Sequence, residues 1–95
     1  NLGLSFPVTL LNNPEALNNL GVIYANGIGV NKDYKKAIYF YKRASDLKSP
    51  TAMYNMAISY KKGLNGLDKN MNKARSYFEK SSRLNFTLAV LELKK

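Results

Sequence analysis

Apolar side chains recur along residues 14–47 at the spacing of two amphipathic helices joined by a short glycine-containing turn. Residues three or four apart lie on the same side of a helix, so each run predicts one buried stripe. The stripe expected on the first helix, residues 14–26, consists of Ala16, Leu20, Ile23 and Tyr24. The stripe expected on the second helix, which runs to about Leu47, consists of Ala37, Phe40, Tyr41 and Ala44.

Residues that typically cap helices stand at the ends of both runs. Asn13-Pro14-Glu15 has a capping side chain, a proline suited to the first turn and an acid near the positive end of the helix dipole. Gly27 can adopt the left-handed conformation that ends a helix. Asn31 or Asp33 is expected to cap the second helix. Ser49-Pro50-Thr51 repeats the first opening.

The same pattern returns after 36 or 37 residues. A shift of 36 places Ala16, Leu20, Tyr24 and Gly27 on Ala52, Met56, Tyr60 and Gly63, and past the turn the shift becomes 37 because the second loop has one extra residue. Further helices are therefore expected over 50–62 and 70–84, and a fifth from about Thr87. A period of this length is typical of an all-α solenoid.

Residues 1–12 do not fit the repeat. Leu2, Leu4, Phe6, Val8 and Leu10 alternate with smaller or polar residues, and a proline interrupts the segment, so an extended lead-in over 1–13 is expected. Its apolar side favours packing on the end of the solenoid. The absence of an initiator Met predicts a mature or excised piece of a longer chain.

The first unit resembles the Sel1-like repeat, a relative of the tetratricopeptide repeat. The residues that carry the resemblance are Ala16, Leu20, Gly21, Tyr24, Gly27, Gly29, Val30, Asp33, Lys36, Ala37, Tyr41 and Ala44. The second unit departs from it at Met56, Ala57 and Ser81 and in its longer loop. The resemblance implies a right-handed α-solenoid of antiparallel helix pairs over 14–95, with repeats at 14–49 and 50–86 and a partial repeat at 87–95.

Composition offers little for catalysis. The chain has no cysteine and no histidine and six carboxylates, so the usual general base and the commonest metal ligand are missing. Two Ser-x-x-Lys matches, at 45–48 and 59–62, lack the companion motifs of penicillin-recognising enzymes. The glycines at 27–29 follow a helix and lack the lysine of a phosphate-binding loop. We expect no enzyme activity, cofactor or metal.

Charge suggests a second class of partner. Fifteen Lys and Arg against six acids give a net charge of +9, which suits nucleic acid or another acidic surface. Basic and aromatic residues interleave over 35–43, but the aromatics are expected on the buried side, and base stacking needs exposed rings. No apolar run approaches the length of a membrane-spanning helix.

The resemblance also suggests where a partner binds, because the first helix of each pair lines the concave side in related repeats. We expect a protein or peptide partner on that side, with an exposed tyrosine as anchor. The residues expected to bind it are Glu15, Asn18, Val22, Tyr54, Ile58 and Lys61. End-to-end self-association through Leu88, Leu91 and Leu93 or through residues 1–12 is a further expectation.

Overall fold

The computed structural model describes residues 12–95 and confirms the all-α expectation. The helices of this part of the chain are α2 (Pro14–Asn26), α3 (Tyr34–Asp46), α4 (Pro50–Lys62), α5 (Met71–Arg83) and α6 (Thr87–Leu93). Each expected helix is present, with ends within one residue of those predicted. The expected lead-in over residues 1–11 lies outside the described residues.

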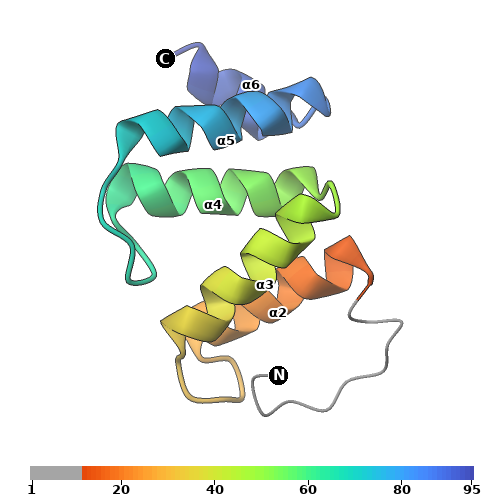
Figure 1. The fold of residues 1–95 in the computed structure, drawn as a ribbon, viewed down its shortest axis with the longest axis vertical. Coiled ribbons are helices and arrows are strands. Elements are labelled where there is room, and N and C mark those ends of the chain that lie inside the picture. Colours follow the sequence, from red (N-terminus) through yellow and green to blue (C-terminus); the bar gives the residue numbers. More distant parts are fainter. Residues whose placement is uncertain (1–11) are drawn as a thin grey trace.

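The helices form antiparallel pairs that stack in chain order (Figure 1). α2 packs against α3 and α4 against α5, while α3 and α2 join the first pair to α4. α6 lies on α5 at the end opposite α2, along the 40 Å long axis. The chain is a right-handed α-solenoid.

Side chains cap the first four helices in two matching ways. The Asn13 side-chain oxygen accepts hydrogen bonds from the N–H groups of Glu15 and Ala16, and the Ser49 hydroxyl accepts one from Ala52. On the second helix of each pair, Asp33 accepts from Lys36 and Asn70 from Lys73. These bonds satisfy N–H groups that the first turn leaves without a helical partner.

The two long loops differ by one residue but close in the same way. Gly27 and Gly63 end α2 and α4 with φ of 65° and 67°. The Asp33 N–H then donates to the Tyr24 carbonyl over 3.0 Å, and the Asn70 N–H donates to the Tyr60 carbonyl over 2.8 Å. The longer loop is tied down by its own residue, because the Asn65 amide donates to the Ser59 hydroxyl over 2.8 Å.

Small residues bring the helices together around two buried clusters. The first cluster contains Leu17, Tyr24, Ala37, Phe40, Tyr41, Ala44, Ala52 and Met56. The second contains Ala57, Ala74, Phe78 and Ala89. Ring contacts repeat as well, since Tyr24 stacks on Phe40 with centroids 5.9 Å apart and Tyr60 on Tyr77 at 6.1 Å. The stacking therefore follows the sequence period.

Two details of the predicted core were wrong. On α2 the fully buried apolar residue is Leu17, while Ala16, Leu20 and Ile23 are half-buried. The reason is that α2 contacts both α3 and α4, so its buried surface is broader than one stripe. On α3, Tyr39 is 46 % exposed and meets Phe40 by its edge, so one of the rings in 35–43 faces outward.

Candidate partner-binding surface

The six predicted binding residues form one row on each of two neighbouring helices. Glu15, Asn18 and Val22 are three or four positions apart on α2, and Tyr54, Ile58 and Lys61 have the same spacing on α4. Such residues share one side of their helix. α2 and α4 contact each other directly, so the two rows lie on adjacent helices. We call these six residues the first-helix row.

Asn18 lies at the contact between α2 and α4. It is buried, and its side-chain oxygen accepts a hydrogen bond from the Asn55 amide over 2.9 Å. Glu15 lies a turn earlier on α2 and is exposed. Within the row, Glu15 is therefore the group most open to a partner, while Asn18 fixes the position of α4 against α2.

The apolar members of the row are half-buried. The Tyr54 ring lies 5.8 Å from the Phe78 ring and 5.5 Å from the Phe86 ring, centroid to centroid. Ile58 packs on the second buried cluster and Val22 on the first. Tyr54 is thus held in place by two aromatic neighbours and offers only part of its surface to a partner.

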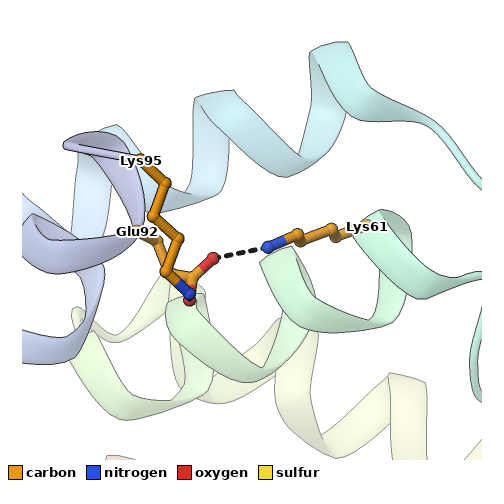
Figure 2. Close-up of polar contacts among 3 residues, drawn as sticks. All are labelled: Lys61, Glu92 and Lys95. Atoms are coloured by element: carbon orange, nitrogen blue, oxygen red, sulfur yellow. Dashed lines mark hydrogen bonds and ion pairs between the residues drawn. The ribbon is translucent and has the colours of Figure 1, made fainter.

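Lys61 belongs to a charged cluster with residues of α6 and the C-terminal end (Figure 2). Its ammonium donates to one Glu92 carboxylate oxygen over 2.7 Å, and the Lys95 ammonium donates to the other over 2.7 Å. These hydrogen bonds, from Lys61 first and then Lys95, lower the pKa of Glu92 to about 2. The same pairing raises the pKa of Lys95. The ion pair attaches α6 to α4.

A cavity of about 360 Å³ opens beside this cluster, between the ends of α4 and α6 and the start of α5. Its lining includes the cations Lys61, Arg75 and Lys95 and the apolar side chains of Phe78 and Leu93. We call it the α4–α5–α6 cavity. Of its residues, the sequence had indicated Lys61 for partner binding and Leu93 for self-association.

Sequence reasoning missed the partners of the row. Asn55 and Glu92 lie 37 and 31 residues from the side chains they bind, and no local motif connects them. One signal was available for Glu92, because it is one of only six carboxylates in a strongly basic chain. A lone acid near the end of an apolar helix favours a specific basic partner.

Other features of the described residues bear on chemistry. In residues 12–95, no three His, Cys, Asp or Glu side chains gather into a metal-binding group. The helices of the same span are all too short or too polar to traverse a lipid bilayer. Of the Ser-x-x-Lys serines, Ser59 donates to the Asn55 carbonyl, and Ser45 is buried with no hydrogen-bond partner among these residues.

Comparison with known proteins identifies this arrangement. The sequence model of the Sel1 repeat matches residues 14–49 and 50–86. The chain belongs to the Sel1 repeat family. Its repeats are of a non-catalytic scaffold type, which generally serves protein–protein interaction. A comparison with curated proteins returned no match.

Two crystal structures share the Sel1 repeat fold. A Sel1 repeat protein from Oxalobacter formigenes is 33 % identical with a TM-score of 0.81, covering 85 % of this chain and 33 % of that one. The protein c5321, a protective antigen present in uropathogenic Escherichia coli strains and displaying an SLR fold, is 24 % identical with a TM-score of 0.81. That match covers 90 % of this chain and 18 % of c5321. This chain therefore spans a third or less of these structures.

Proposed function

We propose that this Sel1 repeat chain binds a protein or peptide segment along the first-helix row, on the concave side of the solenoid. The observation that supports the proposal is the pairing of half-buried apolar side chains, Val22 and Ile58, with the fixed ring of Tyr54 on adjacent helices. A ring that is already held by its neighbours loses little conformational freedom when a partner covers it. Interface anchors are often tyrosines of this kind.

The burial of Ala89 supports the expected division of the chain into two full repeats and a partial third. Ala89 is fully buried against the second cluster, as Ala52 is against the first, and both lie in the first turn of their helix. We infer that α6 begins a third repeat at 87–95 and adds a third helix to the concave side. Leu88 and Leu91 are 50 % and 51 % exposed on that helix, while Leu93 is half-buried in the second cluster.

A second candidate function rests on charge. The chain carries +9, and Tyr39 is exposed beside exposed Lys35 and Lys42 on α3. Exposed rings among cations are the elements of single-stranded nucleic-acid binding. We keep this alternative for the outward side of the second helices, which is separate from the first-helix row.

Peptides selected by display on the immobilised chain test the main proposal. Their affinity should fall about tenfold or more in the double variant Tyr54→Ala, Ile58→Ala, because an anchor residue is worth about 2 kcal/mol or more. The matched control is Tyr39→Ala, Ile38→Ala on α3, which should bind as the parent does. Circular dichroism must show that both variants are folded, since each removes one half-buried apolar side chain and one tyrosine ring.

Salt separates the two candidate functions. A peptide bound by apolar anchors should lose little affinity between about 50 and 200 mM salt, whereas a phosphate-driven complex with an oligouridine should lose orders of magnitude. Two outcomes would contradict peptide binding by the first-helix row. In one, the folded Tyr54/Ile58 variant binds the peptides as tightly as the parent does; in the other, no peptide is selected while oligouridine binds.

A further inference from the structure

The floor of the α4–α5–α6 cavity is apolar and rigid. Ala74 is fully buried and Phe78 is 5 % exposed, so both side chains are fixed by the second cluster. Leu93 packs on the same cluster from α6. A cavity of about 360 Å³ is at the small end of the range for ligand sites and suits one or two side chains.

The equivalent place in the first repeat shows what such a surface accepts. A shift of 37 residues relates the α5 residues Met71, Arg75 and Phe78 to Tyr34, Ile38 and Tyr41 on α3. There the α4–α5 loop covers α3: Leu67 packs on the first cluster, and Leu67 and Gly66 lie beside Tyr34 and Ile38. The outer surface of the second helix of a repeat therefore accepts an apolar side chain from a non-helical segment, as α3 accepts Leu67.

The rim of the cavity differs from its counterpart in charge. Arg75 stands where the first repeat has Ile38, and Lys61 and Lys95 complete a set of three cations around one carboxylate, Glu92. Each lysine gives Glu92 one hydrogen bond of the three that an ammonium can donate. Arg75 is exposed and makes no ion pair within residues 12–95. The rim thus has unused donors and surplus positive charge.

We propose that the α4–α5–α6 cavity binds an acidic peptide segment, with one bulky apolar side chain on the Phe78 floor and flanking carboxylates on Arg75, Lys61 and Lys95. The inference rests on the proposed function and deepens it by naming the chemistry of the partner. Charge complementarity favours this occupant, because three cations share the single carboxylate of Glu92, and an uncharged apolar segment would leave Arg75 without an ion-pair partner.

The proposal is tested by titrating three capped peptides into the isotopically labelled full chain and recording the NMR spectra at about 50 mM salt. The first is acetyl-Glu-Glu-Leu-Glu-amide, the second replaces each Glu by Gln, and the third replaces Leu by Ala. The first should shift amide signals around Ala74, Phe78 and Leu93. The Gln peptide should bind about tenfold weaker, because charge-assisted hydrogen bonds are roughly twice as strong as neutral ones. The Ala peptide should also be weaker.

Two arginines on the same helix provide a matched pair of variants. Arg75→Ala should weaken the acidic peptide about tenfold, while Arg83→Ala, which removes the same charge from α5 outside the cavity, should change it less than about twofold. Both side chains are exposed, so both variants keep the fold.

Equal losses in the two arginine variants would show attraction by net charge alone and overturn the proposal. So would equal binding of the Gln peptide, or tighter binding of an oligothymidine to the same residues. Display-selected peptides that depend on Tyr54 and Ile58 but leave the cavity signals unchanged would refute this inference and retain the proposed function. Loss of both responses would refute the two together.

Discussion

Gly21 shows how close two helices of this solenoid lie. A Cβ atom at that position would stand 2.5 Å from the Tyr41 ring, so the ring rests directly on the α2 backbone. Tyr41 is 5 % exposed, and burial raises the pKa of its phenol. The corresponding pair in the second repeat, Ala57 and Phe78, accommodates a methyl group. The absence of a Cβ atom at Gly21 therefore allows α2 and α3 to approach this closely.

The variant Gly21→Ala should lower stability for this reason. Alanine gains up to about 1 kcal/mol over glycine in a helix, but inserting a methyl group into a packed core typically costs about 1–3 kcal/mol. We expect a net loss of about 1–2 kcal/mol and a melting temperature lower by several degrees. Asn19→Ala, an exposed change on the same helix, should not lower it. A Gly21→Ala protein as stable as its parent would contradict the close contact.

At the scale of one element, α6 combines apolar packing with an ion pair to a neighbouring helix. It has seven residues, below the length at which a helix is stable alone, and its N-cap residue, Phe86, makes no side-chain capping hydrogen bond. Its attachments are the burial of Ala89, the packing of Leu93 on the second cluster and the hydrogen bond that the Glu92 carboxylate accepts from Lys61. Glu92 is thus the polar group that joins α6 to α4.

Acid should therefore loosen α6. The pKa of Glu92 is about 2 in the folded chain and 4.5 ordinarily, so its carboxylate stabilises the fold fully above pH 4.5. That contribution should disappear as the pH falls from about 4.5 toward 2. We expect the parent to lose more unfolding free energy across this window than Glu92→Gln does, measured by urea denaturation at each pH. Parallel curves for the two proteins would rule out the ion pair as a stabilising contact.

In the whole molecule, each helix is supported only by its neighbours in the stack. α4 is central, since it contacts α2, α3 and α5 and supplies residues to both buried clusters. α6 packs mainly on α5. In a solenoid, stability is approximately a sum of such nearest-neighbour terms, so it decreases toward an end that has fewer of them.

Native-state hydrogen exchange should reveal this gradient. Amides of α4 should exchange at the slowest rate of the five helices, and those of α6 at a rate at least about tenfold faster, because local opening follows the number of supporting contacts. Exchange measured by NMR at neutral pH checks the order of the helices. Equal protection of α4 and α6 would indicate one cooperative unit in place of a graded stack.

Sequence patterns predicted the fold because its determinants are local. The caps Asn13, Asp33 and Ser49 and the glycines that end α2 and α4 each act within a few residues, and their recurrence revealed the period. Leu17 was missed because the cluster in which it is buried combines side chains of α2, α3 and α4, and the pattern along one helix does not show such a cluster. The Lys61–Glu92 contact depends on the angle between stacked helices, which no spacing along the chain specifies. The first-helix row stays a prediction.

The same backbone hydrogen bond closes both long loops, so the spacing of the paired helices does not depend on loop length. The Tyr24 and Tyr60 carbonyls each accept a hydrogen bond from the N–H of the residue that caps the next helix. This bond joins the two ends of each long loop, whatever the length of the loop between them. Lengthening a loop costs only about 0.6 kcal/mol for each doubling. Beside Gly29, in the exposed part of the α2–α3 loop, this chain therefore offers a place where a reporter sequence can be inserted without disturbing the stack.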